Sequence, residues 1–272
     1  MGQFGGVPTD ALDHVAFLSR SENRVLVMEA LAVAPRTQRE LRDRTGVPRT
    51  TLSRTLGALE DRGWITRVDG GRYELTTSGT HAVAVFRPAL DGMAALCRLG
   101  ALTAWLPTDE LDIGLHHFRE VRVRRPSANQ PAEAGLYLAS RLEEAQRFDA
   151  LTFIAPPRPV AEVLWERTRS GALTVRTVFA AGLVEYLRVN PDGPVHWPAL
   201  LDAGATVHRY DGRLPCNLFV VDDHVLFAQD RADVGDAGTV VESRNPTVRA
   251  WALDLVARYR DDAERLGPEA FG

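Results

Sequence analysis

The sequence contains no lysine, and all 32 of its basic residues are arginine. Such a chain cannot supply the lysine of a Walker A phosphate loop, of a Schiff base or of a histidine–lysine phosphodiesterase pair. Cysteine is almost absent as well, because Cys97 and Cys216 stand far apart and in no ligand-spaced group. Neither a disulfide framework nor a structural zinc site is predicted, and no cofactor or metal is expected.

Long apolar runs are also missing. No segment approaches the length of a membrane span, and residues 1–15 lack a basic stretch followed by an apolar one. The composition, 45% hydrophobic and 25% charged, is typical of a soluble globular protein. We therefore expect a cytoplasmic protein without membrane contacts, whose 272 residues form one large or two ordinary domains.

Residues 37–75 have the pattern of a helix-turn-helix followed by a β-hairpin wing. Residues 24–34 carry apolar side chains at helical spacing, and Pro35 ends that supporting helix. Thr37 and Glu40 form a capping-box pair, which predicts the start of a second, short helix. Because this motif presents its next helix to the major groove, it predicts double-stranded DNA as a partner.

The next helix has two different faces. Gly46 permits the tight turn before it, and Pro48 suits its first position. At about 100° per residue, one face is suited to packing and gathers Leu52, Thr55, Leu56 and Leu59. The opposite face is polar, small and basic, and it gathers Thr50, Ser53, Arg54 and Gly57. This second face is expected to contact base edges and phosphates, with Arg49 beside it at the helix start.

Two short strand-like stretches follow this helix. Residues 64–68 and 72–76 alternate in the manner of strands, and the turn residues 69–71 between them predict a hairpin. Arg67 and Arg72 bracket the tip of this hairpin. Arginine is favoured where a wing meets the phosphate backbone or a minor groove, so both are expected to contact DNA.

Basic charge is concentrated in this part of the chain. Between Arg36 and Arg72 there are nine arginines against five acidic residues, whereas residues 81–272 hold 21 arginines against 26 acidic residues. This distribution favours a DNA-binding winged helix over the alternative, a winged helix that serves only as a protein-interaction module. The predicted DNA-contacting residues are Arg36, Arg49, Thr50, Thr51, Ser53, Arg54, Arg67 and Arg72.

Residues 77–105 are rich in apolar and small side chains and are expected to be helical. Pro88 and Gly92 leave two readings open, one kinked helix or two separate helices. The segment either forms a dimer seam or packs against the C-terminal domain. His116 and His117 are adjacent and therefore expected to splay apart, which argues against a metal role, and residues 124–135 are expected to form a loop.

The last half of the chain alternates strand-like and helix-like stretches. Strands are expected at residues 149–156, 173–180, 206–212, 217–223 and 224–229. Helices are expected at residues 159–171 and 198–205, and a long amphipathic helix closes the chain at 245–266. The expected fold is mixed, α+β or α/β, with strand ends that could form a pocket. The predicted domains are residues 10–80 (winged helix), 81–135 (helical linker) and 136–272 (effector or dimerisation domain).

The chain resembles the archaeal winged-helix transcriptional regulators of the methanogenesis (filament) regulator type, which are related to the TrmB-like sugar-responsive regulators. The resemblance covers the winged helix and residues 102–118, 204–229 and 245–252. It implies a C-terminal domain with a degenerate phospholipase D-like fold. In active relatives of that fold a histidine and a lysine lie two residues apart on one strand, whereas Asn217 and Phe219 occupy the nearest positions here. The chain is therefore not expected to be an enzyme.

Polar residues around one turn of this domain are candidates for binding a small-molecule effector. They offer hydrogen bonds to an anion or a sugar, although ordinary turn contacts would explain them equally well. The candidates are His208, Arg209, Asp211, Arg213 and Asn217. The function that the sequence favours is a dimeric, DNA-binding transcriptional regulator with a non-catalytic sensor domain.

Overall fold

The computed structural model describes residues 8–125, 133–190, 193, 195–228 and 238–271. The chain divides into two compact units, Met1–Leu90 (the first unit) and Asp91–Gly272 (the second unit). The division falls inside helix α5 (Thr77–Leu99). Each unit has its own hydrophobic core, so each is described by itself.

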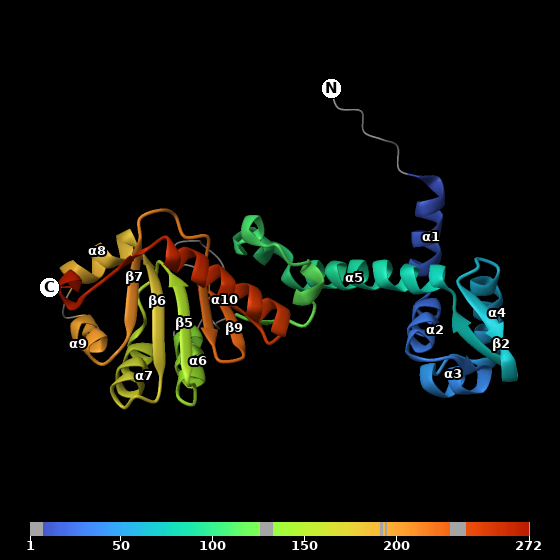
Figure 1. Ribbon diagram of the computed structural model, residues 1–272, viewed down its shortest axis with the longest axis horizontal. Helices are drawn as coiled ribbons and strands as arrows, with labels where there is room; N and C mark the ends of the chain where they lie inside the picture. Colours follow the sequence, from blue (N-terminus) through green and yellow to red (C-terminus); the bar gives the residue numbers. More distant parts are fainter. Residues whose placement is uncertain (1–7, 126–132, 191–192, 194, 229–237, 272) are drawn as a thin grey trace, which may run out of the picture. The chain divides into compact units, whose positions relative to one another are not determined.

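The first unit is a winged helix-turn-helix, as predicted (Figure 1). Its helices before α5 are α1 (Thr9–Ser19), α2 (Glu22–Val33), α3 (Gln38–Thr45) and α4 (Arg49–Glu60). Its described strands are β1 (Arg36–Thr37), β2 (Ile65–Val68) and β3 (Arg72–Leu75), which form an antiparallel sheet in the order β1-β3-β2. The sequence did not predict α1 or β1. The two residues of β1 carry too little pattern to be recognised without their partner β3.

Local hydrogen bonds explain where the short helices of this unit begin and end. Thr37 caps α3: its side chain accepts from the Glu40 amide, and the Glu40 carboxylate accepts from the Thr37 amide at 2.7 Å. Hydrogen bonds from Thr37 lower the pKa of the Glu40 carboxyl. Gly46 ends α3 with φ +70°, a left-handed conformation that glycine adopts without a steric penalty. Pro48 is the N-cap of α4 rather than its first helical residue, because its ψ of 146° is extended.

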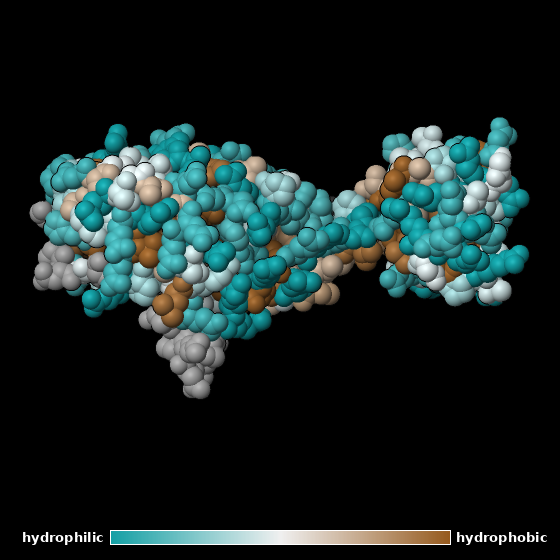
Figure 2. All heavy atoms as spheres, turned by 90° about the horizontal axis from the view of Figure 1, so that it is seen from below, coloured by the Kyte–Doolittle hydropathy of each residue, from teal (hydrophilic) through white to brown (hydrophobic). Residues whose placement is uncertain are grey.

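The core of the first unit is formed by one side of each helix together with the sheet. The side chains of α2, α4 and the wing supply most of it, and its largest fully buried members are Met28, Leu41, Leu52, Leu56, Leu59 and Ile65. Phe17 of α1 packs edge-on against Trp64, with ring centroids 5.7 Å apart. The exposed surface of this unit is mainly hydrophilic in the view of Figure 2.

The second unit is built around a mixed sheet. Eight described strands lie in the order β11-β7-β6-β5-β8-β9-β10-β4. The strands β5, β6 and β7 are parallel, and every other neighbouring pair is antiparallel. Their bounds are β4 (Arg122–Arg124), β5 (Arg147–Thr152), β6 (Thr174–Ala180), β7 (Thr206–Tyr210), β8 (Asn217–Val221), β9 (His224–Ala228), β10 (Val240–Ser243) and β11 (Glu264–Arg265).

Helices cover both faces of this sheet. One face carries α6 (Glu133–Leu142), α7 (Arg158–Arg169), α8 (Ala181–Val189) and α9 (Trp197–Asp202). The other face carries α10 (Pro246–Asp261), which crosses the strands in Figure 1, and the irregular segment after α5. That segment contains the 3-10 turns η2 (Gly100–Trp105), η3 (Thr108–Glu110) and η4 (Leu115–Phe118), and η5 (Pro268–Phe271) closes the chain. The result is the mixed α/β domain that the sequence predicted.

Several expectations about this unit were wrong in detail. Residues 124–135 are not a single loop, since Arg124 pairs in β4 and α6 begins at Glu133; residues 126–132 lie outside the described residues. The closing helix ends at Asp261, and the following residues pair with β7. The helices α6 and α8 and the strands β4, β10 and β11 were not predicted. The edge strands β4 and β11 depend on distant partners.

The helix α5 is continuous, which decides between the two readings that Pro88 and Gly92 left open. Its last turns place Ala95 and Leu99 in the core of the second unit. Other apolar side chains of α5 stay exposed, namely Val85 (74%), Met93 (63%) and Leu96 (38%). Figure 2 shows hydrophobic residues at the surface over part of this helix.

Candidate nucleic-acid interface

The helix α4 has the two faces that its sequence predicts. Leu52, Thr55, Leu56 and Leu59 are all buried against the core of the first unit. On the opposite side, Arg49, Thr50, Ser53 and Arg54 are exposed, and Thr51 is half-buried at the border between the faces. One helix therefore holds four solvent-facing polar groups in fixed register, because its leucine face is locked into the core.

The two arginines of α4 are available to a ligand. Within the described part of the chain, no ion pair or side-chain hydrogen bond engages Arg49 or Arg54. Arg49 is the first residue of α4, where the unsatisfied amides and the helix dipole favour an anionic group such as a phosphate, and Arg54 lies in the next turn. A guanidinium can also donate two parallel hydrogen bonds to a guanine edge.

Sequence reasoning missed one neighbour of this face. The Gln38 side-chain amide donates to the Ser53 hydroxyl, with its Nε2 2.6 Å from Oγ. Gln38 is the first residue of α3, so this bond joins the start of α3 to the exposed face of α4. The signal was available, because the capping box of Thr37 and Glu40 fixes Gln38 as the first helical residue. Gln38 therefore belongs to the candidate interface.

The other predicted arginines have contacts within the first unit. Arg36 is half-buried, and its Nε donates to the Ala30 carbonyl at 3.0 Å. Arg67 donates to the Tyr73 hydroxyl, with its guanidinium carbon 5.0 Å from the centre of that ring. Arg72 donates through Nε to the Asp69 carbonyl at 3.3 Å. Arg67 and Arg72 remain exposed on the wing, whereas Arg36 secures the end of α2.

The five residues predicted as an effector site do not assemble into one site. Successive residues of a strand point to opposite faces, so His208 and Arg209 of β7 face different layers. The strands β6 and β5 separate β7 from β8, which carries Asn217. Arg209 pairs with exposed Asp211 at 3.0 Å, as in the turn-contact alternative. The sequence placed these residues around one turn and gave no sign that two strands separate β7 from β8, so an effector site at the turn itself stays a prediction.

The side chain of Asn217 holds two strands of the sheet together. It is almost completely buried, and its Oδ1 accepts from the Thr152 hydroxyl at 2.9 Å and from the Phe153 amide at 3.0 Å. These bonds fasten the end of β5 to β8. The side-chain amide of Asn217 therefore links two strands of the sheet, and its oxygen is already used by these two donors.

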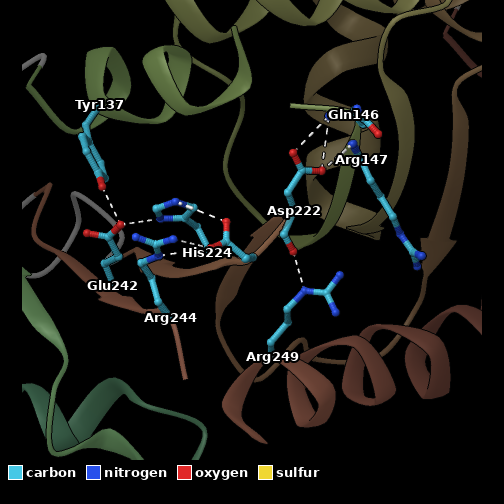
Figure 3. A network of polar contacts seen from close by, with 9 residues as sticks. Tyr137, Gln146, Arg147, Asp222, His224, Glu242, Arg244 and Arg249 are labelled. Carbon is cyan, nitrogen blue, oxygen red and sulfur yellow. Dashed lines mark hydrogen bonds and ion pairs between the residues drawn. The ribbon is translucent and has the colours of Figure 1, made fainter. Parts of the chain in front are cut away.

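A polar network that the sequence did not indicate joins α6, β9 and β10 (Figure 3). Glu242 is buried and accepts a hydrogen bond from the Tyr137 hydroxyl at 2.6 Å, and its Oε1 lies 2.6 Å from His224 Nδ1. Burial raises the pKa of Glu242, but the bonds from Tyr137 and His224 outweigh burial and lower it overall. Burial, with the bond to Glu242, raises the pKa of Tyr137. This network ties α6 to β9 and β10.

The turn after β8 holds a second polar group in Figure 3. Asp222 has φ +49°, and its carboxylate accepts from the amides of Gln146 and Arg147 at the start of β5. Arg249 of α10 donates to the Asp222 carbonyl. These contacts join strand, turn and helix, and they explain the tight connection between β8 and β9.

The two adjacent histidines of the second unit lie in a 3-10 turn. The rings of His116 and His117 lie 4.0 Å apart rather than splayed, because a 3-10 turn places them side by side. Among the residues that the structure describes, no group of three potential ligands could hold a metal ion. Burial lowers the pKa of His117 and of His208, and it raises the pKa of Cys216 to about 12.

No helix within the described ranges is long and apolar enough to cross a membrane.

The first unit is a winged helix-turn-helix and the second is a mixed α/β domain, and this combination defines the class of two-domain winged-helix proteins. Residues 12–96 match the family model of the HVO_A0261 N-terminal domain, and residues 133–262 match that of the middle domain of the methanogenesis regulatory protein FilR1. The chain thus carries a domain of each of these two families, which confirms the resemblance drawn from its sequence.

Solved structures that the chain matches include TrmBL2, described as an archaeal chromatin protein with a novel mode of DNA binding. It is 15% identical, with 95% of this chain and 100% of that chain covered and a TM-score of 0.40. The phospholipase D family member Nuc from Salmonella typhimurium is 12% identical over 54% of this chain and 98% of its own, with a TM-score of 0.39. NucT from Helicobacter pylori is 10% identical over 54% and 99%, with a TM-score of 0.41. No curated protein matches the chain.

Proposed function

We propose that this regulator binds double-stranded DNA and controls transcription, with α4 lying in the major groove and the β2–β3 hairpin against the backbone. The observation that carries the proposal is α4, whose buried leucine face holds Arg49 and Arg54 on the exposed side with no protein partner described. The match to a domain of a regulatory protein supports the same function. Such a protein works in the cytoplasm, where it meets DNA.

In this proposal the second unit is a non-catalytic sensor. The chain has no lysine to complete a histidine–lysine pair, and Asn217 is committed to Thr152 and Phe153. A ligand in this unit would change operator affinity by altering the placement of two DNA-reading helices in a homodimer. The exposed apolar side chains of α5, Val85 and Met93 among them, are the surface on which we expect two copies to meet.

The DNA-binding proposal can be tested with a fluorescein-labelled pool of 30-base-pair duplexes of random sequence, followed by anisotropy. The double substitution Arg49→Ala and Arg54→Ala should weaken binding by about tenfold or more. It should also reduce the slope of log affinity against log salt concentration by about two, which corresponds to the loss of two phosphate contacts. The matched control, Arg158→Ala with Arg169→Ala, removes two exposed arginines of the second unit and the same charge. It should leave the affinity unchanged.

Equal affinity of the two double variants would show that α4 is not the reading helix. Absence of binding by the parent chain at low salt, together with a stable co-purifying protein, would instead favour the protein-interaction module.

A further inference from the structure

The second unit contains a cavity of about 520 Å³. It lies on the sheet face that carries α6 to α9, within the core of that layer. The volume falls within the range of roughly 300–1,000 Å³ that is typical of small-molecule sites. The cavity is open to solvent on one side, so a molecule can enter it from solution.

The walls of the cavity are apolar and uncharged. Aromatic rings supply a large part of them, from Phe148, Phe179, Trp197 and Phe219. No described lining residue is an aspartate, glutamate, arginine or histidine. A charged group placed here would lose its water without gaining a counter-ion, and a sugar would leave several hydroxyls unpaired. The occupant must therefore be neutral and mainly apolar.

Two buried polar groups on the wall lack a partner. Thr177 and Trp197 are 3% and 4% exposed. The hydroxyl of Thr177 and the indole nitrogen of Trp197 make no hydrogen bond within the described part of the chain. An indole N–H can only donate, and buried groups of this kind are nearly always paired. Each of these two atoms has less than 1 Å² of accessible surface, so neither offers a hydrogen bond to an occupant of the cavity. The Phe179 ring, edge-on to the Trp197 ring at 5.0 Å, holds the indole in place.

We propose that this cavity binds a small neutral molecule with a mainly apolar, ring-containing body that packs against its aromatic walls. The inference rests on the sensor role proposed above, for which it names the site and the chemical class of the effector. It places the effector on the sheet face opposite His208, away from the polar turn that the sequence suggested.

The test uses two fluorescent probes and the purified full chain without DNA. Prodan (6-propionyl-2-dimethylaminonaphthalene) has an aromatic body and a ketone oxygen, whereas N-phenyl-1-naphthylamine has an aromatic body and no oxygen. Both should bind saturably with blue-shifted emission. Thr177→Val keeps the side-chain shape and removes a hydroxyl that has almost no surface in the cavity, so it should leave the affinity for both probes unchanged. The control Thr174→Val alters an exposed threonine of the same strand and should change neither affinity.

A second variant fills the cavity. Gly182 lines it from α8, and a Cβ added there meets no atom within 4 Å. Gly182→Leu should therefore fold, as circular dichroism would show, and should abolish binding of both probes. Gly182→Ala is the matched control and should retain it.

Failure of the parent chain to bind either probe would overturn the inference, as would probe binding that Gly182→Leu leaves intact. These outcomes are separate from the DNA test. A chain that binds DNA but neither probe overturns only this inference, and one that binds the probes but not DNA overturns only the DNA-binding proposal.

Discussion

The role of a single residue in this protein depends on neighbours that are distant in sequence, as Asn217 shows. Asn217 stands at a position where related active enzymes have a catalytic group, and its sequence context suggests a polar site. In the folded chain its amide is buried and bonded to Thr152 and Phe153, which precede it by about sixty residues of sequence. The residue therefore contributes to stability rather than to binding.

The stability role of Asn217 is testable. Asn217→Leu should lower the free energy of unfolding by about 2–4 kcal/mol, because it leaves the Thr152 hydroxyl and the Phe153 amide without an acceptor in a buried position. Urea denaturation followed by tryptophan fluorescence measures the change. Asn190→Ala, at the exposed end of α8, is the control and should shift stability by about 0.5 kcal/mol or less. A similar small shift for Asn217→Leu would contradict the assigned role.

At the scale of elements, short-range chemistry predicts the first unit well. The capping box at Thr37, the left-handed Gly46 and the leucine face of α4 were all recognised from residues at most seven positions apart, and the structure confirms each. The hairpin was predicted for the same reason, since its turn residues lie next to its strands. The strand β1 was missed because its partner β3 lies thirty-five residues further along.

The capping box gives a prediction at this scale. Thr37→Ala removes the hydroxyl that accepts from the Glu40 amide, and it should destabilise the first unit by about 1 kcal/mol. Thr37→Ser keeps an accepting hydroxyl and should restore most of that loss. Thermal unfolding followed by circular dichroism would compare the two. If both substitutions cost the same, the methyl group rather than the cap would be responsible.

For the whole molecule, the decisive question is whether two copies associate through α5. Light scattering should give a mass twice that of the 29.9 kDa chain. Met93→Asp would place a charge on the exposed apolar side of α5 and should shift the protein to monomer, because a buried unpaired charge is unfavourable. The control Leu136→Asp places the same charge on an exposed leucine of α6. A dimer that resists Met93→Asp would move the interface elsewhere.

The sequence by itself determined the winged helix, the exposed polar face of α4 and the absence of any lysine for catalysis, because these follow from local spacing and from composition. Only the tertiary structure decided the order of the strands, which separates Asn217 from the other residues predicted for an effector site. Strand order depends on pairing between distant segments, such as β5 with β8 and β10 with β4. The cavity beside Thr177 and Trp197 has the same origin, since its walls come from helices and strands that meet only in the folded second unit.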